Sequence, residues 1–321
     1  MTMEYIILII ALAGIVFGAD YLVSGAVSIA KKYKVSDFVI GAAIVGVGTS
    51  MPELVVSFIG ALQGNADVAI GNVVGSNIFN VLGILGITAV FFPIAVNKDN
   101  MRFEMPLCIG VSLLLTILVF NFFNGSTPAI SRIDGLILLS CFALFMWYSF
   151  HRDKRSRKDT PTANTEIEDK PAPLWLAVTK VVGGLALLIT SCDFFVDNAV
   201  LIAKSFGVND AFISLTLIAC GTSLPELAAS IAAALKKNTQ MALGNIIGSN
   251  IFNITLILGL SSQVMPLNSS GITWVDYAVM TVAAILPMIL GSKGKINRVS
   301  GTVMFIGFIA YNWYLLNSQI A

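Results

Sequence analysis

Apolar stretches of about 20 residues, long enough to cross a bilayer as a helix, recur along the whole 321-residue chain. No other feature limits the fold as strongly, because every backbone polar group inside lipid needs a partner within the protein. A 56% hydrophobic share with only 12% charged residues is too apolar for a water-wetted surface. We predict an all-α polytopic membrane protein. Its ten spans are expected at 4–27, 37–62, 67–92, 103–123, 130–150, 174–198, 210–235, 240–265, 274–291 and 299–317.

A charged segment divides the chain. Residues 151–173 contain HRDKRSRKDT and a Thr, Glu and Pro-rich stretch, which cannot bury a core and predict a solvated linker. The predicted units are a first repeat at 1–150, this linker, and a second repeat at 174–321. With the N-terminus outside, the inward loops and linker hold all but three of the 19 Lys and Arg residues. We therefore predict both termini outside a plasma or inner membrane and a cytoplasmic linker.

The two parts of the chain are copies of each other. A shift of 173 residues places Asp20 on Asp193, GTSMPEL (from Gly48) on GTSLPEL, and GNVVGSNIFN (from Gly71) on GNIIGSNIFN. Shared hydrophobicity does not produce identical Gly, Pro, Glu and Asn positions, so the chain arose by duplication. Five spans per half is an odd number, so the halves enter the membrane from opposite sides. Inverted repeats of this kind are typical of secondary transporters with a binding site near the midplane.

The first repeated motif contains a proline in mid-span. Pro52 has no N–H, so the carbonyl of Gly48 loses its helical partner and the second span is expected to bend. We expect the bend to free neighbouring carbonyls, at Gly46 and at Ala219 in the copy. A free carbonyl at membrane depth is tolerated only where it is buried in protein or lines a wet cavity.

The same motif carries a carboxylate. Thr49 and Ser50 precede Glu53 by four and three residues, so their side chains share one helix face with it. A carboxylate in mid-span costs about 3 kcal/mol on insertion scales, and this chain repeats it. Protonated glutamates that only join helices are the alternative, but they would not require the proline breaks. The hard oxygen ligands favour a cation site, and the copy supplies Thr222, Ser223 and Glu226.

The second repeated motif adds polar side chains beside the first. Ser76 and Asn80 are four residues apart on one face, as are Ser249 and Asn253 in the copy. Hydrogen bonding between helices is the simpler interpretation, but recurrence next to the glutamate motif favours lining of the pocket. Gly71 and Gly75, with Gly244 and Gly248, are interpreted as helix-packing positions.

Other function classes find little support. The basic residues lie in short loops and form no patch for nucleic acid, and no nucleophile with a base is present for an enzyme. A channel would need a continuous pore rather than occluding repeats. We therefore expect no enzyme activity and no cofactor. Asp20 and Asp193 lie near helix ends and are not assigned as ligands.

The doubled GTS(M/L)PE and GN(V/I)(V/I)GSNIFN motifs resemble the two repeats of the cation/calcium antiporter superfamily, and its sodium/calcium exchanger branch most of all. The resemblance covers most of the chain. It implies that the bent second, third, seventh and eighth helices surround one ion cluster, while helices one and six slide past them. The linker has no room for the regulatory domain of animal exchangers, which favours a minimal prokaryotic type, expected to work as a monomer in the lipid bilayer.

The resemblance also implies roles for residues. Glu53 and Glu226 would be the central Ca2+ ligands, helped by carbonyls of Thr49 and Thr222. Oxygens expected to serve Na+ come from Ser50, Ser76, Ser223, Ser249 and the carbonyls of Gly46 and Ala219. Some relatives carry Asp at a position equivalent to Asn80 or Asn253, whereas this chain has Asn at both and only two carboxylates. The expected function is electrogenic exchange of Na+ for Ca2+, with Ca2+/H+ antiport on the same glutamates as the alternative.

Overall fold

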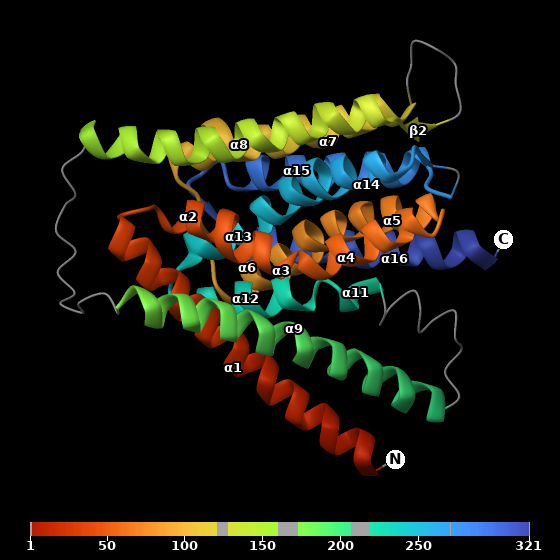
Figure 1. Ribbon diagram of the computed structural model, residues 1–321, viewed down its shortest axis with the longest axis horizontal. Helices are drawn as coiled ribbons and strands as arrows, with labels where there is room; N and C mark the ends of the chain where they lie inside the picture. Colours follow the sequence, from red (N-terminus) through yellow and green to blue (C-terminus); the bar gives the residue numbers. More distant parts are fainter. Residues whose placement is uncertain (1, 121–127, 160–172, 207–218, 270, 321) are drawn as a thin grey trace.

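The computed structural model describes residues 2–120, 128–159, 173–206, 219–269 and 271–320. Its helices run along the length of an elongated bundle (Figure 1). Both termini lie at one end, here called the termini end. Helix α8 ends and helix α9 begins at the other end, here called the linker end. This arrangement places the N-terminus and C-terminus on the same side of the bundle.

The first half consists of one long helix, a bent span and three further helical segments. Their bounds are α1 (Thr2–Tyr33), α2 (Asp37–Ile40), η1 (Gly41–Gly46), α3 (Val47–Thr49), α4 (Met51–Leu62), α5 (Ala66–Ile78), η2 (Phe79–Leu85), α6 (Gly86–Phe91), η3 (Asn100–Glu104), α7 (Met105–Phe120) and α8 (Arg132–Asp159). The η segments are π-helical turns, which often mark functional positions in helices.

The described elements of the second half follow the same order, without a π-helical turn equivalent to η3. These elements are α9 (Leu174–Ser205), α11 (Ala219–Gly221), α12 (Leu224–Leu235), α13 (Thr239–Phe252), η5 (Asn253–Ile257), α14 (Leu258–Val264), α15 (Trp274–Leu290) and α16 (Arg298–Ile320). The only strands in the described residues are two-residue pairs, so the predicted all-α class is confirmed.

The number of spans is only partly resolved. Within the described residues, seven helices are long and apolar enough to cross a membrane, and α2–α3 with α4 form an eighth span. Helices α12 and α15 are apolar but shorter. The predicted span 210–235 lies partly outside the described residues, so the count of ten and the three predicted units stay predictions. Helix α8 continues to Asp159, so the first part of the predicted linker is helical.

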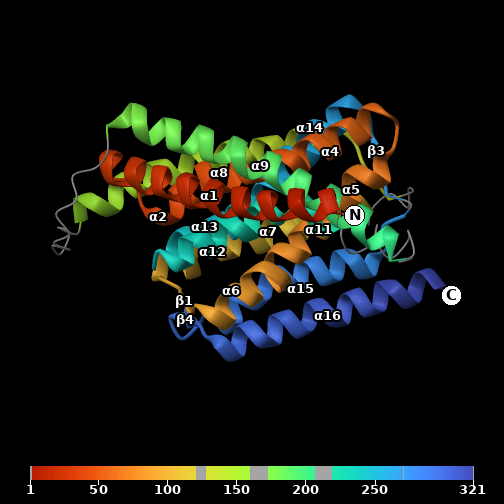
Figure 2. The same ribbon diagram turned by 90° about the horizontal axis from the view of Figure 1, so that it is seen from below.

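Two strand pairs show how the halves are related. Strand β1 (Ile94–Ala95) pairs with β4 (Lys295–Ile296), and β2 (Ala129–Ile130) pairs with β3 (Leu267–Asn268). Under the shift of 173 residues, Ile94 becomes Leu267, so β1 and β3 are equivalent strands. They lie at opposite ends of the bundle (Figure 2). The two halves are therefore inverted, as predicted.

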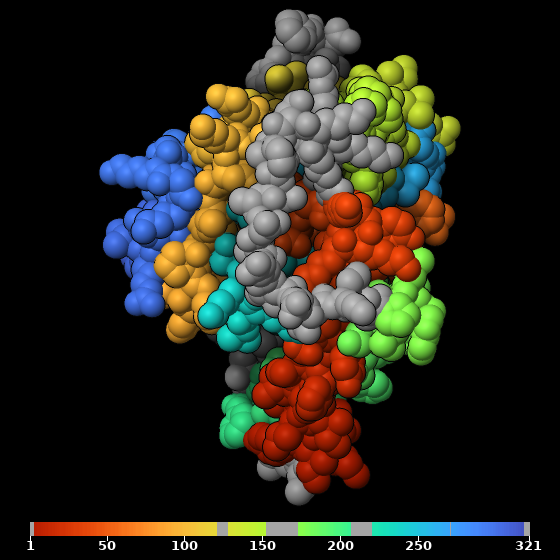
Figure 3. All heavy atoms as spheres, turned by 90° about the vertical axis from the view of Figure 1, so that its left-hand side faces the viewer, coloured from red at the N-terminus to blue at the C-terminus, as the bar shows by residue number. Residues whose placement is uncertain are grey.

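Helices α1 and α9 form a long antiparallel pair along one side of the bundle (Figures 1 and 3). Glycines make the contact: a Cβ on Gly18 would lie 2.7 Å from the main-chain nitrogen of Leu188, and one on Gly184 would lie 2.5 Å from that of Leu22. Each of the two helices has 32 residues, longer than the predicted 4–27 and 174–198. The prediction was too short because it used the length that a bilayer core requires, and both helices extend beyond it.

The third and eighth spans form the centre of the bundle. In the most apolar window of Thr239–Val264, 94% of residues are buried, and in that of Ala66–Phe91, 78%. The corresponding shares are 28% for α1 and 22% for α9, and many of the large apolar side chains on these two helices are exposed. The repeated motifs therefore lie in the most enclosed part of the molecule, and the helices expected to slide lie at its edge.

Candidate ion-binding site

The two proline motifs break their helices in the same way. Helix α3 ends at Thr49 and α4 begins at Met51, with a bend of 48° between them. Ser50 adopts φ −83° and ψ 9°, and Ser223 adopts φ −92° and ψ 8° at the equivalent break. Each proline lies in the first turn of the new helix, where a missing N–H costs nothing. The predicted break is confirmed in both halves.

Each break places a helix N-terminus in the middle of the protein. Glu53 lies in the first turn of α4, and Glu226 in the first turn of α12. The positive end of the helix dipole favours a negative charge at this position. The bend therefore supplies local support for two carboxylates that are fully buried.

Each carboxylate is also held by the opposite half. The hydroxyl of Ser50 donates to Glu226 Oε1 at 2.7 Å, and that of Ser223 donates to Glu53 Oε1 at 2.8 Å. All four side chains are 0% exposed. The structure therefore brings together the two motifs that the sequence separates by 173 residues, and it encloses them from solvent.

The threonine hydroxyls contact asparagines of the second motif in the opposite half. Thr49 Oγ1 donates to Asn245 Oδ1 at 3.2 Å, and Thr222 Oγ1 donates to Asn72 Oδ1 at 3.5 Å. Both hydroxyls therefore have partners beside the site, and the expectation that each motif presents two hydroxyls to the cation stays a prediction. The remaining oxygen of each threonine is the main-chain carbonyl, the atom that the family resemblance implies.

Gly46 lies at the site, but its carbonyl is not freed as expected. It accepts the Ser50 N–H at 3.0 Å, the Thr49 hydroxyl at 3.4 Å and the Ser249 hydroxyl at 3.2 Å. The expectation was wrong because α3 stays helical through Thr49, so the N–H of Ser50 still reaches this carbonyl. Ala219 is the equivalent residue at the start of α11, beside residues 207–218, which lie outside the described part of the chain.

The second motif lines the same enclosed region. Asn80 and Asn253 lie in the π-helical turns η2 and η5, and both are fully buried. Segment η2 contacts α12, and η5 contacts α4, so each asparagine lies on a segment packed against the opposite half's glutamate helix. Ser249 is also buried, and Ser76 is 2% exposed.

Several buried oxygens at this site lack a hydrogen-bond partner among the described residues. They are Glu53 Oε2, Glu226 Oε2, Asn80 Oδ1, Asn253 Oδ1 and Ser76 Oγ. An unsatisfied buried acceptor costs about 1–3 kcal/mol, so five of them in one region require compensation. A hard cation such as Ca2+ takes carboxylate, amide and carbonyl oxygens as ligands. These oxygen ligands therefore fit a transported cation.

The glycine interpretation is confirmed in the second copy. A Cβ on Gly244 would lie 2.2 Å from the Phe38 carbonyl oxygen, and one on Gly248 would lie 2.5 Å from the Ala42 Cα. Gly75 has no atom of the described residues within 4 Å of such a Cβ. Residues equivalent to Phe38 and Ala42 fall within 207–218, so packing at the first copy stays a prediction.

Sequence reasoning missed a frame of asparagines and serines around the site. Asn72 Nδ2 donates to the Glu53 carbonyl at 3.1 Å and to Ser57 Oγ at 2.9 Å. Asn245 Nδ2 makes the same two bonds, at 3.1 and 2.9 Å, to the Glu226 carbonyl and Ser230 Oγ. These residues are identical in both repeats, which is the signal that could have identified them.

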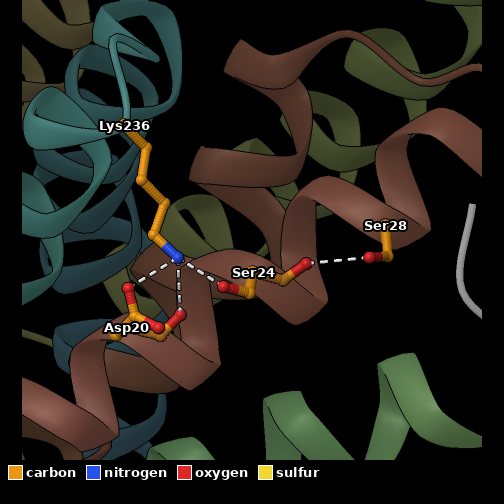
Figure 4. A network of polar contacts seen from close by, with 4 residues as sticks. All are labelled: Asp20, Ser24, Ser28 and Lys236. Atoms are coloured by element: carbon orange, nitrogen blue, oxygen red, sulfur yellow. Dashed lines mark hydrogen bonds and ion pairs between the residues drawn. The ribbon is translucent and has the colours of Figure 1, made fainter. Parts of the chain in front are cut away.

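Asp20 belongs to a polar contact outside the site. Lys236, just after α12, places Nζ 2.7 Å from Asp20 Oδ1 and 3.1 Å from its carbonyl oxygen, and also contacts Ser24 Oγ on α1 (Figure 4). Ser28 Oγ donates to the Ser24 carbonyl at 2.9 Å. The equivalent positions in the other half are Gln63 and Asp193, so the halves differ here.

An all-helical membrane fold of inverted repeats, with an enclosed oxygen-lined site shared by both halves, is typical of a secondary transporter of cations. The chain belongs to the sodium/calcium exchanger protein family, whose model matches residues 3–151 and 176–317. It is 40% identical to the putative antiporter CaxA of Alkalimonas amylolytica over 99% of this chain and 100% of that protein. It is 29% identical to the sodium/calcium exchanger MaX1 of Methanosarcina acetivorans, with 97% of each covered. A structure of the sodium-calcium exchanger NCX_Mj matches with a TM-score of 0.83 and 29% identity, covering 97% of this chain and 98% of that one.

Proposed function

We propose that this protein exchanges Na+ for Ca2+ across a plasma or inner membrane by alternating access. The observation that carries the proposal is the pair of buried carboxylates, each held through one oxygen by a serine of the opposite half. The second oxygen of each carboxylate has no partner among the described residues. The names of the relatives support the same ion pair.

The Ca2+ ligands in this proposal are oxygens of both repeats. Ca2+ takes 6 to 8 oxygen ligands. Glu53 and Glu226 supply carboxylate oxygens, and Thr49 and Thr222 supply carbonyls, since the hydroxyls of both threonines already donate to asparagines. Asn80 and Asn253 add amide oxygens. Together these residues would offer the oxygen ligands that Ca2+ prefers.

The Na+ ligands in this proposal include the serine hydroxyls. Ser50 and Ser223 direct their protons at the glutamates, and a hydroxyl that donates still has lone pairs for a cation. Ser76 and Ser249, on the second motif, are proposed as further Na+ ligands. Ser249 also donates to the Gly46 carbonyl, which would keep its bond from the Ser50 N–H if the Ser249 hydroxyl rotated toward Na+. The carbonyls of Gly46 and Ala219 are also proposed as Na+ ligands.

With both ionised, Glu53 and Glu226 give the empty site a charge of −2 in this proposal. One Ca2+ neutralises it, whereas three Na+, as the family resemblance implies, would leave +1. Exchange would then move net charge and respond to membrane potential, at about 2.3 kcal/mol per charge per 100 mV. We also propose a monomer in lipid with termini outside and the linker cytoplasmic, with no enzyme activity and no cofactor.

The test is uptake of radioactive calcium into proteoliposomes that contain the purified protein. Vesicles loaded with Na+ and diluted into Na+-free buffer are expected to accumulate Ca2+, and vesicles with only a pH gradient are not. A potential set by K+ and valinomycin, negative on the side that gains Na+, is expected to speed exchange. Uptake driven by the pH gradient without Na+ would favour Ca2+/H+ antiport, and indifference to potential would argue for electroneutral exchange.

A further inference from the structure

Two buried asparagines face each other where the halves meet. Asn77 in α5 donates through Nδ2 to the Asn250 carbonyl at 3.4 Å, and Asn250 in α13 donates through Nδ2 to the Asn77 carbonyl at 3.1 Å. They are 1% and 2% exposed. A main-chain carbonyl can only accept a hydrogen bond, so both NH2 groups must point at it. The orientation of both side-chain amides is therefore fixed.

The amide oxygens of this pair accept from the next two asparagines. Asn250 Oδ1 accepts from Asn80 Nδ2 at 3.0 Å, and Asn77 Oδ1 accepts from Asn253 Nδ2 at 3.2 Å. Because an oxygen faces each of these NH2 groups, Asn80 and Asn253 cannot present their amides the other way round. Their own Oδ1 atoms are then directed elsewhere, fully buried and without a partner among the described residues.

We propose that Asn77 and Asn250 are positioning residues that orient Asn80 and Asn253 so that both amide oxygens face the transported cation. This inference rests on the proposed function. Asn77 and Asn250 bind no ion themselves. Each acts on a residue of the other half: Asn77 orients Asn253, and Asn250 orients Asn80.

The hydrogen bonds that Asn80 and Asn253 donate to Asn250 and Asn77 also explain why neutral amides fit positions 80 and 253 in this chain. Each position must donate a hydrogen bond to an amide oxygen. An ionised carboxylate there would place two acceptors against each other, a repulsive contact in a buried site. Asn77 and Asn250 therefore favour a site with two carboxylates over one with three.

The test is a double-mutant cycle on Ca2+ binding to purified protein, measured by calorimetry in Na+-free buffer. Leu has the same number and branching of side-chain heavy atoms as Asn and has no hydrogen-bonding group. Asn80→Leu and Asn250→Leu are each expected to weaken Ca2+ binding about 10-fold to 100-fold, as loss of outer-shell partners does at metal sites. The double variant is expected to bind no more weakly than Asn80→Leu alone, because Asn250 acts only through Asn80.

The control is Asn312→Leu in α16, where the asparagine donates only to a carbonyl of its own helix. Its Ca2+ affinity is expected to stay within about twofold of the unaltered protein. Additive losses in the double variant, or unchanged Ca2+ affinity in Asn250→Leu, would contradict the proposal that Asn250 positions Asn80. If the Asn250 variants do not fold, the same test can be made on the equivalent pair, with Asn77→Leu and Asn253→Leu. Absence of both Ca2+ and Na+ binding in the unaltered protein would instead contradict the proposed function.

Discussion

The two halves of the molecule are alike at the ion-binding site and different at the edge of the bundle. Around the site, each hydrogen bond between Ser50 and Glu226 or between Thr49 and Asn245 has its counterpart under the shift of 173 residues. At the edge, Lys236 holds Asp20, whereas the equivalent positions are Gln63 and Asp193.

The difference separates two tasks. A site built from inverted copies offers equivalent ligands toward both ends of the bundle, as a transporter that binds the same ions from either side requires. A contact made at only one end can favour one state over the other, because it is lost when that end opens. The serine–glutamate and threonine–asparagine bonds of the site are therefore symmetric, and the contact of α1 with Lys236 is not.

Loss of either glutamate is expected to have the largest effect and to test the symmetry directly. Glu53→Gln and Glu226→Gln each remove one of two charges that the cation needs, so Na+-driven calcium uptake in proteoliposomes should fall by about 100-fold or more. Both variants should remain folded, as judged by a single gel-filtration peak. Near-normal uptake in one variant and none in the other would show that the halves are not equivalent at the site.

Loss of a serine should have a smaller effect. Ser50→Ala and Ser223→Ala each remove a hydrogen bond to a buried carboxylate, worth about 1.5–3 kcal/mol, and a proposed Na+ ligand. The Na+ concentration that gives half-maximal exchange is expected to rise about 10-fold in both. Ser140→Ala, whose hydroxyl bonds only within α8, is the control. A rise in one variant alone would contradict equivalent roles.

Replacement of Lys236 should change only modestly the equilibrium between the states that are open to one membrane face or to the other. Exposed ion pairs contribute about 0.2–1 kcal/mol, so Lys236→Gln should change the ratio of Ca2+ KM values at the two membrane faces by at most about fivefold. Inside-out and right-side-out vesicles give the two values. Gln63→Lys gives the first half the lysine equivalent to Lys236, and we expect it to move the ratio in the opposite direction. Shifts in the same direction would show that the contact does not set the preference.

Replacement of residues 160–172, between the two halves, should have the smallest effect on the exchange rate. Residues 160–172 lie outside the described part of the chain, and their composition predicts a solvated linker. Replacement by a Gly and Ser sequence of the same length is expected to leave the exchange rate within about twofold. A larger loss would mean that this segment takes part in transport. The same uptake assay serves for this comparison.

The sequence by itself determined the helical membrane class, the inverted repeat, the two breaks and the two glutamates. These features are local or repeated: a proline removes its own N–H, an apolar run has its own length, and identical motifs show duplication directly. Tertiary structure alone decided that Ser50 serves Glu226, that Gly46 keeps its helical partner, and that Asn250 orients Asn80. Those contacts join residues of opposite halves or depend on where a helix ends. Such contacts leave no periodic pattern, because side-chain direction across an interface depends on packing and not on spacing along the chain.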